Sequence, residues 1–145
     1  MSIVVEDYHK HYGATVAVAG ITFSVSAGEV LGLVGPNGAG KTTTMRALAG
    51  ILVPTRGRLS IDGHDLAAEP VAAKAALAYV PDDPHLFERL TVWEHFRFVA
   101  AAYRLGDWQE RAEQLLERLE LTEKRHALAS ELSRGMRQKV AIGCG

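Results

Sequence analysis

One stretch near the start of the chain constrains the fold more than any other part of the sequence. Residues 35–42 read Gly-Pro-Asn-Gly-Ala-Gly-Lys-Thr and fit the pattern G-x-x-x-x-G-K-[ST]. The apolar run Val30–Val34 precedes them, and a helical pattern follows through about Ala49, with Gly50 as a left-handed stop. A strand, a glycine-rich turn and a helix N-terminus together present backbone N–H groups to an anion. The sequence therefore predicts a phosphate-binding loop in an α/β fold, with Val30–Val34 as a strand buried on both faces.

The residue types in this loop suit a nucleoside triphosphate. Gly38 and Gly40 allow dihedral angles and a close approach that a side chain would block. Lys41 places a positive charge on the β and γ phosphates, and the Thr42 hydroxyl is a hard ligand for Mg²⁺. The alternative is a glycine-rich turn with an exposed lysine. The predicted phosphate-binding and nucleotide-binding residues are Gly35, Pro36, Asn37, Gly38, Ala39, Gly40, Lys41, Thr42 and Thr43.

Composition excludes several classes of protein. The 145 residues are 48% hydrophobic and carry 16 Lys and Arg against 17 Asp and Glu, which gives a net charge of −1. This balance excludes intrinsic disorder and argues against a protein that binds nucleic acid through bulk charge. No apolar stretch approaches the roughly 18 residues of a membrane helix, and the N-terminus does not resemble a secretory signal. We expect a soluble, cytoplasmic protein that does not bind nucleic acid.

The first part of the chain is predicted to be rich in strands. Residues 2–26 contain alternating apolar positions, which are typical of half-buried strands. Residues 58–61 predict a short edge strand before a tight turn at Asp62-Gly63. The run Ala76–Val80 predicts a second buried strand that ends at Pro81.

The second part is predicted to be helical. Thr91 and Glu94 have the spacing of a capping box, Asp107 begins a further helix, and Ser133 is the N-cap candidate for a helix from about residue 134 to residue 142. The expected organisation is a β-rich and phosphate-loop core over residues 1–84 and a helical lobe over residues 85–145. The six histidines form no metal-binding pattern, and we expect them to be surface or packing residues.

A segment near the end of the helical lobe narrows the family. Residues 131–142 read Glu-Leu-Ser-Arg-Gly-Met-Arg-Gln-Lys-Val-Ala-Ile, which resembles the LSGGQ signature and signature helix of ATP-binding cassette (ABC) proteins. Tyr12-Gly13, residues 16–18 and residues 30–43 agree with the same family, in the family's order. The chain is therefore similar to the nucleotide-binding subunit of an ABC transporter. This resemblance implies a P-loop NTPase core with an N-terminal antiparallel β part and an inserted helical lobe.

The resemblance also implies roles for single residues. Tyr12 matches the aromatic residue that stacks on adenine, with a core or edge-strand tyrosine as the alternative. Asp82 stands where the family has a glutamine that senses Mg²⁺ and contacts the membrane subunit. A carboxylate can still ligate Mg²⁺ directly or through water, although it cannot donate the amide hydrogen bond. The alternative for this position is a plain turn at Asp83-Pro84.

The signature retains two residues and departs at two others. Ser133 and Gly135 supply a hydroxyl group and an unobstructed N–H at a helix N-terminus, whereas Arg134 replaces the first glycine and Met136 replaces the glutamine. In this family the signature closes over the ATP that a second subunit holds, so the resemblance implies a head-to-tail dimer. An ordinary N-cap is the alternative for Ser133, and both readings can hold together. The Leu-Ser-Arg-Gly-Met sequence and the aspartate at residue 82 resemble subunits of simple two-component exporters.

Hydrolysis in this family needs an apolar strand that ends in Asp, then a Glu that orients water, and a later switch His. The 145 residues contain none of these after the signature, so we expect an N-terminal portion of a larger cassette whose C-terminal core strands are absent. An unpaired Val30–Val34 would then expose a sheet edge, and we expect marginal stability or aggregation. The implied function is MgATP binding, with hydrolysis in the complete protein, to power transport with a transmembrane permease at the inner face of the cell membrane. Alternatives are a nucleotide-binding fragment without turnover, a soluble non-transport ABC protein and a small-molecule kinase.

Overall fold

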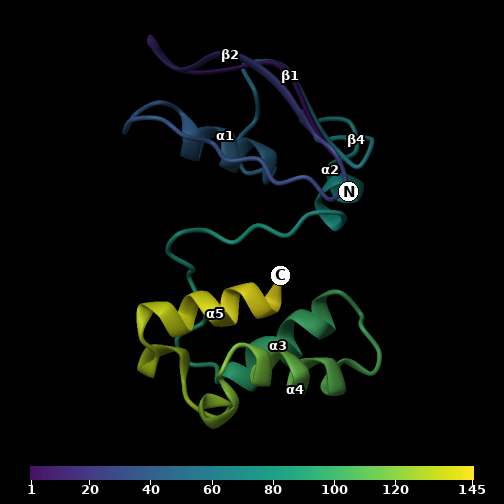
Figure 1. Ribbon diagram of the computed structural model, residues 1–145, viewed down its shortest axis with the longest axis vertical. Coiled ribbons are helices and arrows are strands. Elements are labelled where there is room, and N and C mark those ends of the chain that lie inside the picture. The colour runs from purple at the N-terminus through teal and green to yellow at the C-terminus, as the bar shows by residue number, and fades with distance from the viewer. The chain divides into compact units, whose positions relative to one another are not determined.

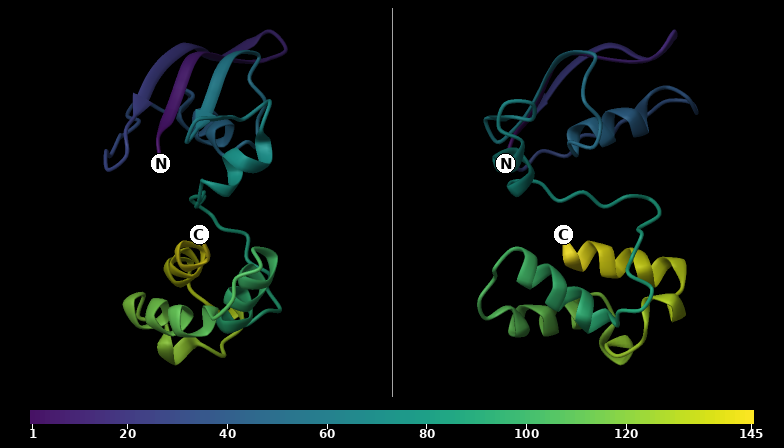
Figure 2. Two further views of the ribbon diagram at one scale, coloured as in Figure 1. Left: turned by 90° about the vertical axis from the view of Figure 1, so that its right-hand side faces the viewer. Right: turned by 180° about the vertical axis from the view of Figure 1, so that it is seen from behind.

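The computed structural model describes all residues from 1 to 145. The chain divides into two compact units, which we call the sheet unit (Met1–Ala78) and the helical unit (Tyr79–Gly145). The division that the sequence suggested, after residue 84, falls in the irregular segment that precedes the first long helix. The domain assignment stays a prediction. Figures 1 and 2 show the strands and short helices of the sheet unit and the helices of the helical unit.

The sheet unit is built on a four-stranded antiparallel sheet in the order β2-β1-β3-β4. Strand β3 pairs with β1 on one side and with β4 on the other, so the expectation that residues 58–61 form an edge strand is wrong. The added strand β4 follows the predicted turn at Asp62-Gly63, where both residues have positive φ values. The elements of this unit are β1 (Ile3–Tyr12), β2 (Thr15–Val25), α1 (Lys41–Leu48), β3 (Arg56–Ile61), β4 (His64–Asp65) and α2 (Pro70–Ala75).

A bulge in β1 decides which side chains face the core. Val5 and Tyr8 are three residues apart and both fully buried, although a regular strand places residues two apart on one face. The register shifts between these two residues, and Asp7 has a φ of 46°. Gly57 on β3 lies so close to this bulge that a Cβ there would collide with the Asp7 carbonyl oxygen. The bulge therefore inserts one residue and returns Tyr8 to the core.

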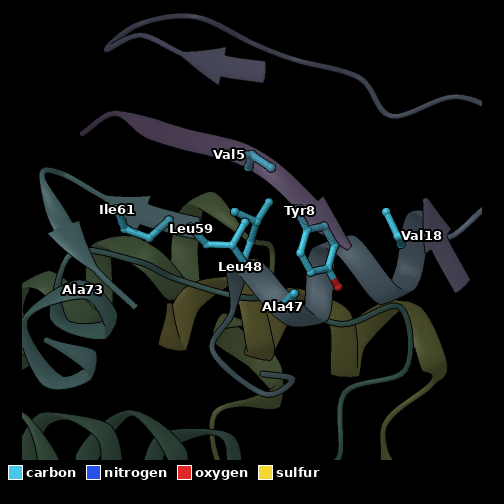
Figure 3. Close-up of a cluster of buried hydrophobic side chains, with 8 residues drawn as sticks. All are labelled: Val5, Tyr8, Val18, Ala47, Leu48, Leu59, Ile61 and Ala73. Carbon is cyan, nitrogen blue, oxygen red and sulfur yellow. The ribbon is translucent and has the colours of Figure 1, made fainter. Parts of the chain in front are cut away.

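Helix α1 packs against the buried face of this sheet. Figure 3 shows side chains from the strands pointing toward α1, with the Tyr8 ring directed at the helix. Tyr8 is fully buried, and its hydroxyl group has no hydrogen-bond partner. Burial also raises the pKa of this phenol. The buried core of the sheet unit consists of Val5, Tyr8, Val18, Ala47, Leu48, Leu59, Ile61 and Ala73.

Two predicted strands are not present. Val30–Val34 belongs to no strand and pairs with no other segment, and the side chains of Val30 and Val34 are each 97% exposed. Ala76–Val80 is also irregular and follows directly after α2. A strand satisfies its N–H and C=O groups only through a neighbouring strand, and the 145 residues offer no neighbour to either run. Both runs have the apolar sequence of a buried strand, but the pairing that burial requires is missing.

The helical unit packs three long helices around its own core. Its elements are α3 (Val92–Ala102), α4 (Trp108–Arg118), the 3-10 helices η1 (Thr122–Lys124) and η2 (Ala129–Glu131), and α5 (Arg134–Cys144). The expected helices are confirmed. None of the helices in either unit is long and apolar enough to cross a membrane. The buried core of this unit consists of Val92, Phe96, Ala112, Leu116, Leu121, Leu132 and Val140.

Local hydrogen bonds fix the start of α3. The predicted capping box is confirmed, because the Thr91 hydroxyl accepts from the Glu94 N–H and the Glu94 carboxylate accepts from the Thr91 N–H. These bonds from Thr91 lower the pKa of the Glu94 carboxyl. His95 is buried, and its Nε2 accepts from the Phe87 N–H while its Nδ1 donates to the Thr91 carbonyl oxygen. His95 is thus a packing residue with both ring nitrogens satisfied.

Candidate nucleotide-binding site

The predicted phosphate loop occupies residues 35–40 and leads directly into α1, which begins at Lys41. Gly38 and Gly40 each have a φ of 84°, a left-handed conformation that side chains disfavour. The Ala39 N–H donates to the Pro36 carbonyl oxygen over 3.2 Å, which closes the turn. The loop therefore has a backbone that depends on glycine, and it leads directly into a helix N-terminus, where unpaired N–H groups favour an anion.

Gly40 is held by close contact with the sheet. A Cβ at this position would lie 2.5 Å from the Ala17 carbonyl oxygen and 2.9 Å from the Val18 Cγ2 atom, both on β2. The Gly40 carbonyl oxygen accepts from both the Thr44 N–H and the Thr44 hydroxyl, over 2.8 and 3.0 Å. Only glycine fits between β2 and the first turn of α1. This contact fixes the point where the loop becomes a helix, and sequence reasoning missed the part that Thr44 plays in it.

The Lys41 ammonium group lies over the loop. Its Nζ donates to the carbonyl oxygens of Gly35 and Pro36 over 2.7 and 2.8 Å. An ammonium group has three N–H donors, so these two bonds orient it and leave one for a ligand. Thr42, in the first turn of α1, is exposed, as are Asn37 and Gly38. A cation, backbone N–H groups and a free hydroxyl around one helix N-terminus fit a phosphate chain with Mg²⁺.

Tyr12 lies at the end of β1, where it pairs with Thr15 of β2. Its side chain is 49% exposed, so the alternative of a core tyrosine is wrong. Strand β3 pairs with β1 only as far as His9, so at Tyr12 the only neighbouring strand is β2 and the alternative of an edge-strand tyrosine stays open. Lys10 lies 5.2 Å from the centre of the Tyr12 ring and donates to the Val53 carbonyl oxygen over 2.8 Å. This cation–π contact involves one face of the ring. Lys10 was missed, although its i, i+2 spacing from Tyr12 on a strand was visible in the sequence.

The signature segment forms the start of α5 in the helical unit. Ser133 is the N-cap, and its hydroxyl accepts from the Met136 N–H over 3.3 Å. The ordinary N-cap reading is thus confirmed, and it leaves the signature role open. Gly135 is exposed, with no atom within 4 Å of the place that a Cβ would take. This arrangement leaves the first turn of α5 accessible to an anion.

The structure brings Asp82 to the signature segment. The Arg134 Nη2 atom lies 3.0 Å from the Asp82 Oδ2 atom. Four residues further along α5, the Gln138 Nε2 donates to the Pro81 carbonyl oxygen over 3.0 Å. Residues 81 and 82 are therefore tied to α5 twice, once through the backbone and once through an ion pair. Nothing in the sequence indicates this contact, because Asp82 and Arg134 are 52 residues apart.

No cluster of three or more His, Cys, Asp or Glu side chains that could hold a metal ion is present. Cys144 is half-buried, and burial raises the pKa of its thiol to about 11, so the thiolate is disfavoured near neutral pH. The phosphate loop, rather than a metal centre or a reactive thiol, is the chemically distinctive part of the chain.

Comparison with known proteins places the chain in a family. Residues 18–145 match the family model described as ABC transporter. The chain belongs to the ABC transporter family. Its relatives include the SkfA peptide export ATP-binding protein SkfE of Bacillus subtilis, which is 40% identical over 95% of the chain and 58% of that protein. The lipopolysaccharide export system ATP-binding protein LptB of Acidithiobacillus ferridurans is 37% identical over 92% of the chain and 57% of its own length.

Solved structures agree with this ABC assignment. An ATP-binding subunit of an ABC transporter matches with a TM-score of 0.92 and 37% identity, over 100% of this chain and 61% of that one. A bacterial Atm1-family ABC exporter with ATP bound matches with a TM-score of 0.83 and 28% identity, over 99% of this chain and 27% of that one. The expected α/β P-loop fold and the family resemblance are confirmed. The chain spans somewhat more than half the length of the curated relatives SkfE and LptB.

Proposed function

We propose that the chain is the MgATP-binding portion of an ABC transporter subunit, which in the complete protein hydrolyses ATP to power transport. One observation carries this proposal: a glycine loop enters α1 with Gly40 packed against β2 and the Lys41 ammonium group held over the loop. That arrangement has no evident purpose in packing, because the loop residues from 35 to 39 are exposed. It suits a polyanion that needs fixed donors and a positive charge.

Each loop group has a distinct task in this proposal. The backbone N–H groups and the N-terminus of α1 bind phosphate oxygens, and Lys41 neutralises charge on the β and γ phosphates. The Thr42 hydroxyl ligates Mg²⁺, which supplies charge neutralisation along the phosphate chain. Tyr12 stacks on the adenine with the ring face opposite Lys10. These groups bind and orient the nucleotide, and none of them activates the attacking water.

Partners complete the proposed activity. Ser133 and Gly135 would act on ATP held by a second subunit in a head-to-tail dimer, which the exposed first turn of α5 supports. A transmembrane permease would bind the subunit at the cytoplasmic face of the membrane.

The test is a titration of the 145-residue chain with a fluorescent ATP analogue and Mg²⁺. We expect saturable binding that Lys41→Ala weakens about 10- to 100-fold, because charged hydrogen bonds contribute about 1.5–3 kcal/mol. Lys74→Ala is the matched control, since Lys74 is an exposed lysine on α2 of the same unit. Equal affinities for wild type and Lys41→Ala would overturn the proposal.

Two further measurements separate the finer parts of the proposal. Asp82→Asn should weaken the Mg²⁺ dependence of binding if Asp82 is a metal ligand, and an unchanged dependence would remove it from the metal site.

Steady-state phosphate release tests turnover. We expect binding without release by this chain alone, which is the behaviour of a nucleotide-binding fragment without turnover. Release that disappears in Lys41→Ala would contradict that expectation.

A further inference from the structure

Two departures from the family pattern meet in the helical unit. Asp82 stands at the glutamine position of the family, and Arg134 stands at the first glycine of the signature. The two side chains form an ion pair with 3.0 Å between Nη2 and Oδ2. Each change alone adds a charge, and the two charges cancel where they meet. The two departures therefore form one ion pair in the structure.

The ion pair between Asp82 and Arg134 is weak enough to open, so that Arg134 can bind another anion. One nitrogen contacts one oxygen, and the side chains of Asp82 and Arg134 are 95% and 70% exposed. Exposed pairs of this kind are weak and open readily in water. The Gln138 hydrogen bond to the Pro81 carbonyl oxygen is less exposed and holds the backbone of the segment independently. The Asp82 carboxylate can therefore leave Arg134 while residue 81 stays attached to α5.

Arg134 lies at a position where a nearby negative charge is stabilising. It is the first residue of α5, where the helix dipole disfavours a cation. Asp82 supplies a carboxylate at that point and so acts as a counterion. Ser133 and Gly135, the neighbours of Arg134, are the residues proposed to meet a nucleotide phosphate of a second copy. An internal carboxylate and an external phosphate would then compete for one guanidinium group.

We propose that Asp82 is a positioning residue that holds Arg134 as an internal counterion and yields it to the nucleotide phosphates bound by a second copy of the chain. The proposal rests on the function proposed above, since it requires the head-to-tail dimer. Arg134 then contributes to closing the dimer only after Asp82 has been displaced. In this role Asp82 acts through Arg134, which makes the two residues epistatic.

The first test measures nucleotide-dependent dimerisation by analytical ultracentrifugation with the magnesium complex of a non-hydrolysable ATP analogue. We expect Asp82→Asn to tighten the dimer about two- to fivefold, because it removes the competing anion from an exposed pair. Arg134→Gln should weaken it, and the double variant should match Arg134→Gln. Asp82→Glu should restore wild-type behaviour. Tightening by Asp82→Asn that persists without Arg134, or no change in any variant, would overturn the proposal.

The second test needs no nucleotide. Amide hydrogen exchange of Met136 and Arg137 reports the first turn of α5, since both N–H groups bond to Ser133. Asp82→Asn should speed this exchange up to about fivefold by leaving Arg134 uncompensated, whereas Arg134→Gln and the double variant should not. Glu120→Gln is the matched control, because it removes the ion pair of 2.8 Å between Glu120 and Lys139, and Lys139 lies on α5. Identical exchange in wild type and Asp82→Asn would contradict the counterion role.

The outcomes separate this proposal from the proposed function. A wild-type chain that binds no nucleotide in the fluorescence titration refutes the proposed function and, with it, competition by phosphate. A chain that binds nucleotide but dimerises equally in all variants leaves the proposed function intact and refutes only the role of Asp82.

Discussion

Apolar sequence patterns predict burial correctly in the helical unit but only in part of the sheet unit. In the helical unit α3 and α5 begin with side-chain caps, and Leu116 and Leu121 are buried to 1% and 0% exposure. In the sheet unit the core under β1 and β3 is equally closed, yet Val30 and Val34 are 97% exposed. A helix satisfies its backbone within itself, whereas a strand depends on a neighbour. Apolar sequence therefore predicts burial only where the pairing partner is also present.

The largest expected effect tests whether the two units are separate. Leu116→Ala removes a fully buried side chain from the helical core and should destabilise that unit by about 2–5 kcal/mol. Amide exchange should accelerate in α3 and α5 but not in the β1–β3 ladder. Equal acceleration in both units would show that the chain unfolds as one cooperative body and would remove the basis of the comparison.

The next effect tests the close contact at the phosphate loop. Gly40→Ala should destabilise the sheet unit by about 1–3 kcal/mol more than Gly28→Ala, because its Cβ would clash with β2. Gly28 is a matched control, since its φ of 83° is nearly the same and no atom lies within 4 Å of its Cβ position. Denaturant unfolding gives both values. Equal losses of stability in the two variants would mean that the positive φ alone, and not the contact with β2, requires glycine at residue 40.

A smaller effect concerns the polar atom buried under the sheet. Tyr8→Phe removes a hydroxyl group that has no partner and should stabilise the sheet unit by about 1 kcal/mol. Thermal unfolding of the two proteins measures the difference. A loss of stability in Tyr8→Phe would show that the Tyr8 hydroxyl group makes a stabilising hydrogen bond in the core.

The capping box gives a pH-dependent effect in the helical unit. Thr91→Ala should lower the free energy of unfolding of the helical unit by about 1 kcal/mol, because it removes the N-cap hydroxyl group of α3. The pKa of Glu94 is lowered in the folded state, so its contribution is full above its ordinary pKa near 4.5 and is lost as the pH falls through the lower folded pKa. The stability gap between wild type and Glu94→Gln should therefore close in acid. A gap that stays constant from about pH 7 to about pH 3 would argue against the carboxylate as the cause.

The smallest effect on stability sharpens the contrast between exposed and buried apolar runs. The double variant Val30→Ser/Val34→Ser should change the free energy of unfolding by less than about 0.5 kcal/mol, because both side chains are exposed. It should nevertheless reduce aggregation, which an exposed apolar run promotes. Light scattering during storage measures this. Strong destabilisation by the double variant would mean that these valines are packed.

The features that can be predicted well from the sequence are local in the chain. The phosphate loop, the start of α1, the Thr91 capping box and the Ser133 cap all depend on residues within a few positions of one another. Local hydrogen bonds and dihedral preferences leave a readable pattern.

The features that sequence reasoning misses depend on distant residues. The runs 30–34 and 76–80 have the composition of buried strands, but strand formation requires a partner that spacing along the chain does not reveal. The contact between Asp82 and Arg134 joins residues that are 52 positions apart. Each of the two is visible in the sequence as a departure from the family pattern, and only the fold shows that they form an ion pair.

The most direct test of the central claim is amide hydrogen exchange of the 145-residue chain with and without saturating MgATP. If the glycine loop binds the phosphates, exchange should slow in residues 35–44, while α4 and η1 stay unchanged. Protection should disappear in Lys41→Ala. Unchanged exchange in residues 35–44 at saturating MgATP, or protection confined to the helical unit, would contradict the assignment of this loop as the nucleotide site.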